Sequence, residues 1–147
     1  MAERITVPFV EGHFAWPTEE PRLLGTRCRS CSTAVFPASF TCPNPACPQP
    51  DVVDHQFGRT GTLASYTVVR YPPPPPFVPP DPFEPFAIAE VAFDEGVQVI
   101  GPVPHEYGLV FELGIPMETT IDTYYTDEDG RDVLGWKFRP AAGERDA

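Results

Sequence analysis

The chain has 147 residues, of which 41% are hydrophobic, and its 21 acidic side chains outnumber 10 basic ones, for a net charge of −11. That length suits one domain, or one small domain with a metal module, and the apolar fraction can fill a core. A strongly acidic chain repels polyanions, so we expect no nucleic-acid partner. No apolar run approaches the roughly 20 residues that span a bilayer, and the start of the chain has no signal-peptide core. We therefore expect a soluble, cytoplasmic protein with no membrane partner.

The first 27 residues predict a helical lead-in made of two short pieces. Its apolar side chains include Phe9, Phe14, Trp16, Leu23 and Leu24. Pro17 and Pro21 prevent one long helix, because proline lacks the amide hydrogen and clashes with the preceding turn. We expect the aromatic rings to pack on the module that follows or on a partner.

Three arginines, Arg22, Arg27 and Arg29, gather around the first cysteine. Although the chain as a whole is acidic, this local basic group could meet a small anionic group. The alternative is an ordinary solvated basic face, and the sequence leaves both interpretations open.

The four cysteines of the chain lie within 20 residues, as a Cys-X2-Cys pair followed by a Cys-X4-Cys pair: Cys28, Cys31, Cys42 and Cys47. This spacing predicts a zinc ribbon over residues 28–50, because two chelating pairs can wrap one tetrahedral metal. Four thiolates leave no position for water or substrate, so the Zn²⁺ would be structural. Two disulfides, formed in an oxidising compartment, and free thiols are the alternatives, and the missing leader argues against the disulfides.

From residue 51 the pattern becomes that of short β-strands separated by turns. We predict strands over residues 61–71, 86–93, 97–100, 118–125 and 133–138. Five strands without a long helix predict a mainly β fold, with a five-stranded oligonucleotide/oligosaccharide-binding (OB) barrel over residues 51–140. We expect the last seven residues, 141–147, to be a disordered tail. The acidic turn at Asp127 and Asp129 lacks the distal glutamate of a calcium loop, so we expect a solvated hairpin.

Residues 72–85 form a proline-rich segment between the first two predicted strands. Such a run favours the stiff polyproline II conformation, so it predicts a long, rigid loop of the barrel. Phe77, Phe83 and Phe86 could present a docking surface that loses little entropy on binding. The loop could instead pack on its own barrel, or serve as a ligand for an SH3-like domain.

We find no catalytic constellation in the sequence. His13, His55 and His105 are scattered and belong to no nucleophile or metalloprotease motif, and the cysteines are already assigned to zinc. We therefore name no catalytic residue and do not expect turnover by this chain alone.

The order of these segments resembles the DUF35 family, which has a helical lead-in, a rubredoxin-like zinc ribbon and an OB fold. The resemblance covers roughly residues 5–140. It is carried by the cysteine pairs with the intervening Phe36-Pro37, by barrel segments 61–69 and 85–91, and by the closing 138–140. There are two departures from the family pattern. Ser32 stands where the family usually has glycine, and the second cysteine pair is four residues wide where two are usual.

The resemblance implies a non-catalytic accessory subunit that docks on a thiolase-superfamily enzyme, such as benzylsuccinyl-CoA thiolase or a steroid side-chain aldolase. It would stabilise that enzyme and shape its acyl-CoA channel, and the catalytic residues would lie on the partner. Two copies on a symmetric enzyme dimer would give an α2β2 heterotetramer. The alternative is a free-standing acyl-CoA carrier or sensor, in which Arg22, Arg27 and Arg29 contact the CoA phosphates. The acyl-CoA substrate and the pathway stay open.

Overall fold

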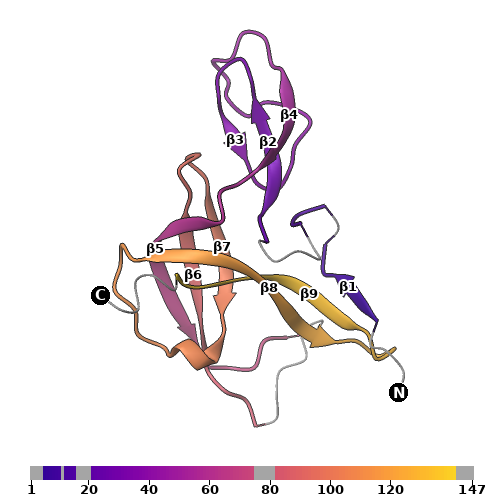
Figure 1. Ribbon diagram of the computed structural model, residues 1–147, viewed down its shortest axis with the longest axis vertical. Helices are drawn as coiled ribbons and strands as arrows, with labels where there is room; N and C mark the ends of the chain where they lie inside the picture. Colours follow the sequence, from indigo (N-terminus) through magenta and orange to yellow (C-terminus); the bar gives the residue numbers. More distant parts are fainter. Residues whose placement is uncertain (1–4, 11, 16–20, 75–81, 142–147) are drawn as a thin grey trace.

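The computed structural model describes residues 5–10, 12–15, 21–74 and 82–141, which form two β-sheets (Figure 1). The smaller sheet has the order β3-β2-β4, with β2 (Leu24–Cys28), β3 (Ala34–Val35) and β4 (Val52–Gln56). The larger has the order β1-β9-β8-β5-β6-β7. Its strands are β1 (Thr6–Pro8), β5 (Thr60–Val69), β6 (Phe86–Ala92), β7 (Gln98–Val103), β8 (Pro116–Thr126) and β9 (Asp132–Pro140).

The five strands predicted from the sequence are confirmed as β5 to β9. Strand β5 pairs antiparallel with both β6 and β8, β6 pairs with β7, and β8 pairs with β9. Register shifts at Leu63/Ser65 in β5 and at Thr123/Tyr125 in β8 mark bulges, which bend strands and increase their twist. Strand β7 lies against β9, so the sheet curls into the expected OB-type barrel.

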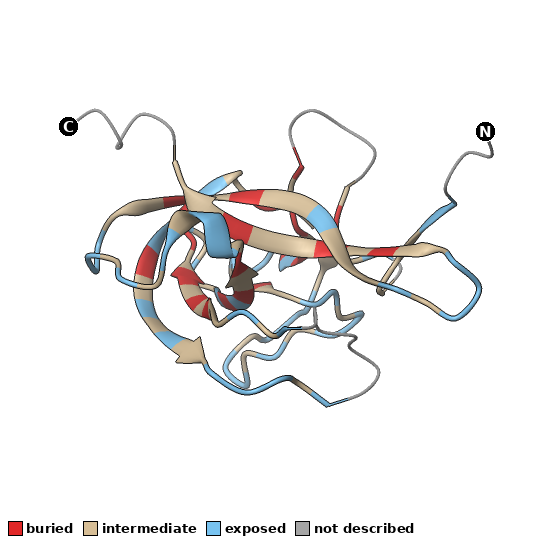
Figure 2. Cartoon of the chain, turned by 90° about the horizontal axis from the view of Figure 1, so that it is seen from below, coloured by how far each residue is buried: buried red, intermediate tan, exposed pale blue. Residues whose placement is uncertain are grey.

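Alternating side chains build the barrel core. In β6 the residues Ala87, Ala89 and Val91 are fully buried and their neighbours are only partly buried, as expected for a strand with one inward face. Buried positions recur in the same way along the other barrel strands (Figure 2). The long connection between β5 and β6 contains the proline-rich segment, of which residues 75–81 lie outside the described residues, as does the predicted tail from residue 142.

The helical lead-in expected over residues 1–27 is wrong for the part of that segment the structure describes. Strand β1 runs parallel to β9 instead, pairing Thr6 with Asp132, and Phe14 forms an antiparallel bridge with Leu23. The physical reason is long-range pairing, because the free edge of β9 offers hydrogen bonds that a short, proline-interrupted helix cannot match. Across the described ranges the one helical element is the three-residue 3-10 turn η1 (His105–Tyr107), and no helix there could cross a membrane.

Aromatic rings connect the small sheet to the barrel. Phe36 comes from the chain between the two cysteine pairs, and its ring centroid lies 5.4 Å from that of Trp136 in β9. Phe57, at the end of β4, lies 6.2 Å from Phe36 and 5.8 Å from Phe93. Both Phe57 and Phe93 are buried. One continuous core therefore joins the metal module and the barrel.

A hydrogen-bonded pair connects the same two parts nearer to the surface. His55 Nε2, in β4, lies 2.8 Å from Glu95 Oε2, in the turn between β6 and β7. The Gly58 amide also donates to that carboxylate oxygen at 3.3 Å. Burial raises the pKa of Glu95, but the hydrogen bonds from His55 and the backbone together lower it by more. The pKa of Glu95 therefore lies below the usual value of 4.5.

Candidate metal centre and apolar groove

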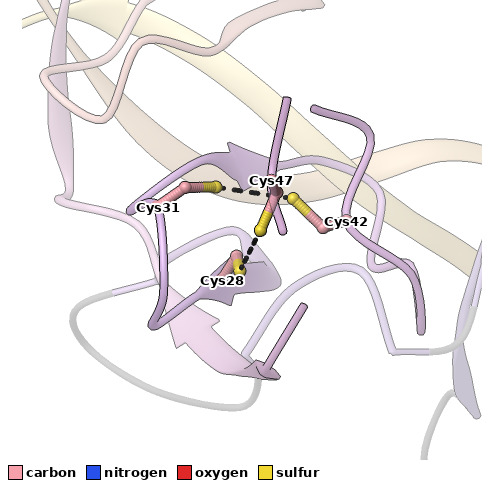
Figure 3. A group of neighbouring side chains, drawn as sticks. All are labelled: Cys28, Cys31, Cys42 and Cys47. Atoms are coloured by element: carbon pink, nitrogen blue, oxygen red, sulfur yellow. Dashed lines mark hydrogen bonds between the residues drawn. The ribbon is translucent and has the colours of Figure 1, made fainter. Parts of the chain in front are cut away.

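The four cysteine sulfurs converge at the end of the small sheet (Figure 3). All four Sγ atoms lie within 4.8 Å of one another, with Cys28 to Cys47 at 3.8 Å and Cys31 to Cys42 at 3.5 Å. Around zinc with Zn–S bonds of about 2.3 Å, a tetrahedron separates the sulfurs by about 3.8 Å. A disulfide needs about 2.05 Å, and all four cysteines are free. The donor set therefore fits one tetrahedral zinc ion.

The first cysteine pair forms a tight turn. The Ser32 amide donates to the Cys28 carbonyl at 2.7 Å, and the Cys28 amide donates to the Thr33 carbonyl at 2.8 Å. Ser32 has φ = 68°, a left-handed conformation that glycine adopts at little cost. This explains why glycine is usual at the position, and it shows that serine can occupy it without displacing a ligand.

The second cysteine pair spans a wider loop. Asn44 organises it, because its carbonyl accepts from the Cys47 amide and its side-chain Oδ1 accepts from the Ala46 amide, each at 3.0 Å. Pro43 and Pro45 restrict the backbone on either side of Asn44. The two extra residues are thus absorbed in an Asx-type turn, and Cys42 and Cys47 still reach the metal position.

In the absence of a metal, the protein environment lowers the pKa of two of the cysteine thiols and raises the pKa of the other two. Hydrogen bonding to the Thr33 hydroxyl and amide lowers the pKa of Cys31 to about 6. The Asp51 amide, 3.5 Å from Cys28 Sγ, lowers the pKa of that thiol, whereas burial raises the pKa of Cys47 to about 12. A divalent metal is needed to bring all four into the thiolate form, so metal binding releases protons.

The three arginines have separate surroundings. Arg22 Nη1 donates to the Phe57 carbonyl at 3.3 Å, and Arg29 pairs with Asp51 through Nε at 2.9 Å and Nη2 at 2.8 Å. Arg27 lies exposed on β2. Arg22 and Arg29 thus have structural partners, and a contact of any of the three with CoA phosphates stays a prediction.

The histidines also have structural contacts. His13 stacks on Trp136 with ring centroids 6.2 Å apart, His55 is hydrogen-bonded to Glu95, and His105 pairs with Glu84 at 3.1 Å.

The acidic turn between β8 and β9 is stabilised by its own hydrogen bonds. The Asp127 carboxylate accepts from the Asp129 and Arg131 amides and from the Arg131 guanidinium. These hydrogen bonds hold the pKa of the Asp127 carboxyl below its usual range.

The structure also contains an apolar groove of about 680 Å³ on the barrel, beside the described ends of the proline-rich segment. Its walls come from β7, β8, β9, the Phe9 region and residues 83–88. Sequence reasoning identified Phe83 and Phe86 as candidate docking residues but missed the strand residues. The sequence feature that could have indicated the groove is a glycine within β7 (Gly101) and within β9 (Gly135), because glycine inside a strand often marks a close approach by another group. Indeed a Cβ at Gly101 would lie 2.8 Å from the Phe138 ring, and one at Gly135 would overlap the Tyr124 ring.

Comparisons with known proteins agree with this two-part architecture. The chain is 30% identical to a "DUF35 domain-containing scaffold protein" of Pyrococcus furiosus over 83% of its own length and 85% of that protein. The chain belongs to the DUF35 family. A scaffold protein of the same name from Methanocaldococcus jannaschii is 27% identical over 80% of this chain and 81% of the relative.

The two parts of the chain match two family models separately. Residues 15–51 match the ChsH2 rubredoxin-like zinc ribbon domain, and residues 54–122 match the ChsH2 C-terminal OB-fold domain. Among solved structures, the chain is similar to a chain of the "Ltp2-ChsH2(DUF35) aldolase", with a TM-score of 0.59 and 27% identity, covering 82% of this chain and 86% of that one. Together with the sulfur geometry, the ribbon match supports a structural zinc held by the four cysteines.

Proposed function

We propose that this protein is a non-catalytic scaffold subunit that docks on a thiolase-like acyl-CoA enzyme. It stabilises that enzyme and helps to shape its acyl-CoA channel. The observation that carries this proposal is the similarity along both domains to the ChsH2(DUF35) chain of an aldolase assembly, at 27% identity and a TM-score of 0.59. The two archaeal relatives named as scaffold proteins support the same role.

The chemistry of the metal centre supports an accessory role. Four thiolates complete the coordination of zinc, so the metal would have no position for water or substrate and would act through folding. His55 and Glu95 are acid–base groups next to the barrel, and they are hydrogen-bonded to each other where the ribbon meets the barrel. In this proposal the reacting groups belong to the partner subunit, and two copies on a symmetric enzyme dimer give α2β2.

Co-purification from the native host tests the proposal. The tagged chain is purified under mild conditions, the proteins that accompany it are identified by mass spectrometry, and the mass of the complex is measured by light scattering. We expect a stoichiometric thiolase-superfamily subunit whose acyl-CoA turnover or stability falls when this chain is removed. A chain that is recovered alone, or a partner whose activity and stability are the same without it, contradicts the proposal.

A free-standing acyl-CoA carrier is a second candidate, and the observation in its favour is the apolar lining of the groove, which would hold the acyl chain and not the CoA phosphates. At about 680 Å³ it lies within the range of small-molecule pockets. Titration calorimetry of the isolated chain with acyl-CoAs of several chain lengths separates the two functions. Micromolar binding favours the carrier, and absence of heat at high micromolar concentration excludes it.

A further inference from the structure

The groove on the barrel has an apolar floor that is partly exposed in the isolated chain. Aromatic and aliphatic side chains make up most of its lining, among them Phe9, Phe83, Phe86, Ile100, Tyr124 and Trp136. Ile100, on β7, is 59% exposed although it lies among these rings. A large apolar surface of this kind, bounded by polar residues, is typical of an interaction site.

The floor of the groove is built rigidly. The Trp136 indole Nε1 donates to the Ile100 carbonyl at 3.0 Å, and the Tyr124 hydroxyl donates to the Trp136 carbonyl at 2.5 Å. Burial raises the pKa of Tyr124, so this hydroxyl stays protonated and keeps donating. Gly101 and Gly135 let the rings approach the backbone closely. A preformed surface needs little ordering when it binds, which favours affinity.

The rim of the groove is acidic. Glu84, Glu106 and Asp122 belong to the lining. The two groups there that can carry positive charge are already paired, Lys137 with Asp122 at 3.4 Å and His105 with Glu84 at 3.1 Å. Glu106 lies exposed on η1, and the chain as a whole carries a net charge of −11. The lining thus has three carboxylates against one lysine and one histidine, and this excess of acidic groups favours a cationic occupant over an anionic one.

We propose that this groove binds a segment of the partner subunit in which apolar side chains are flanked by lysine or arginine. The apolar side chains cover Ile100 and Trp136, and the cations meet the exposed carboxylate of Glu106 on the rim. The inference rests on the proposed scaffold function and adds the docking surface and the chemistry of what docks there. It also argues against this groove as the binding site of the CoA phosphates, because the acidic rim would repel them.

Two pairs of matched variants test the surface in the complex with the co-purified thiolase-superfamily subunit. Ile100→Asp puts a charge on the groove floor, and Val110→Asp makes the same change at a side chain that is 85% exposed and outside the lining. Glu106→Lys reverses a rim charge, and Glu128→Lys does so in the exposed β8–β9 turn. Affinity is measured by biolayer interferometry at low and high salt, and folding by circular dichroism.

We expect Ile100→Asp to weaken the complex at least about tenfold, as for a central interface residue, and Glu106→Lys to weaken it and to flatten its salt dependence. Both control variants should bind like the wild type. If the wild-type complex forms and both groove variants keep its affinity, the inference is wrong and the scaffold function stands. If the wild type forms no complex, the proposed function fails and the inference fails with it.

Photocrosslinking identifies the occupant directly and does not depend on the stability of the Ile100 variant. A photoreactive p-benzoylphenylalanine replaces Glu106, and the crosslinked peptide is sequenced from the assembled complex. We expect a partner peptide in which apolar residues neighbour lysine or arginine. A peptide without cationic residues, a crosslink to acyl-CoA, or crosslinks only from a matched probe at Val110 would overturn the proposal.

Discussion

At the scale of single residues, Ser32 is the clearest case of local backbone strain in the metal centre. Its φ of 68° lies in the left-handed region, where a side chain crowds the following carbonyl. The turn nevertheless forms, because the Ser32 amide donates to the Cys28 carbonyl and the Cys28 amide donates to the Thr33 carbonyl. A zinc ion held by the four cysteines would stabilise the same turn. The other interactions of the zinc ribbon therefore offset the free-energy cost of the positive φ at Ser32.

Replacing Ser32 with glycine should therefore stabilise the protein. We expect Ser32→Gly to raise the free energy of unfolding by up to about 1 kcal/mol, since glycine loses the steric cost but adds freedom to the unfolded chain. Denaturant unfolding at saturating zinc measures it. Ser32→Ala is the control, because it removes the hydroxyl and keeps the strained φ. An equal gain from Ser32→Ala would place the effect in the side chain and contradict this account.

Gly135 is a second position where a small residue is required. A Cβ there would overlap the Tyr124 ring, whereas a Cβ at Gly58 would meet only the Thr60 carbonyl at 3.9 Å. We expect Gly135→Ala to destabilise the protein by roughly 1–3 kcal/mol through overpacking, and Gly58→Ala to change stability much less. Thermal and chemical unfolding of both variants measure the difference. Equal stabilities would show that Tyr124 moves aside freely.

At the scale of elements, the zinc ribbon depends on its metal more than on its own strands. Strand β3 has two residues and β2 and β4 have five each, too few to bury a separate core. Four sulfur ligands supply the missing stability, because in such sites the free energy of metal binding is free energy of folding.

Removing one sulfur ligand should therefore release the metal and open the ribbon. We expect Cys47→Ser to lose the single zinc ion and the hydrogen-exchange protection of amides in β2 to β4. Zinc is measured by elemental analysis and protection by mass spectrometry. Ser30→Ala is the control, because it removes only a hydrogen bond to the Gln49 carbonyl in the same ribbon. A metal-free Cys47 variant with native protection would refute the structural zinc assignment.

At the scale of the whole molecule, the ribbon and the barrel share one hydrophobic core. Two rings on the ribbon side, Phe36 and Phe57, pack against each other. Phe36 also packs on Trp136 of the barrel, and Phe57 packs on Phe93 of the barrel. The His55–Glu95 pair connects the two parts near the surface, with the Glu95 side chain 16% exposed. A rigid connection of this kind would hold the metal module at a constant position relative to the groove.

The His55–Glu95 connection should make stability depend on pH in a defined direction. The pKa of Glu95 is depressed in the folded protein, so its contribution is present above the unfolded value near 4.5 and is lost as pH falls through the lower folded pKa. We expect Glu95→Gln to cost roughly 1.5–3 kcal/mol at pH 7, as for a lost hydrogen bond to a charged group.

The stability difference between the wild type and Glu95→Gln should then shrink as pH is lowered below about 4.5, where the wild-type carboxylate also becomes protonated. Comparing the two proteins at each pH cancels the loss of zinc, which acid causes in both. Unfolding is followed from pH 7 to pH 3 by tryptophan fluorescence. A difference that stays constant or grows toward low pH would contradict the role given to Glu95.

The zinc ligands and the barrel strands could be predicted because their signals are local. Cysteine spacing encodes the chelating pairs, and alternation with turn residues encodes strands β5 to β9. The N-terminal strand was missed because Thr6 to Pro8 carry little pattern of their own. Their conformation follows from pairing with Asp132 to Leu134, more than 120 residues away in sequence.

The metal centre, the order of the two units, the mainly β class and the resemblance to the DUF35 family could all be inferred before any tertiary contact was known. The first three depend on spacing or on period-two alternation within a short stretch of chain, whereas the family resemblance depends on the matching segments along most of the chain. The course of β1, the contact between Phe36 and Trp136, and the apolar groove with its acidic rim depend on the folded arrangement of the chain. These features arise where side chains from distant segments meet, and no local pattern records which distant residues come into contact.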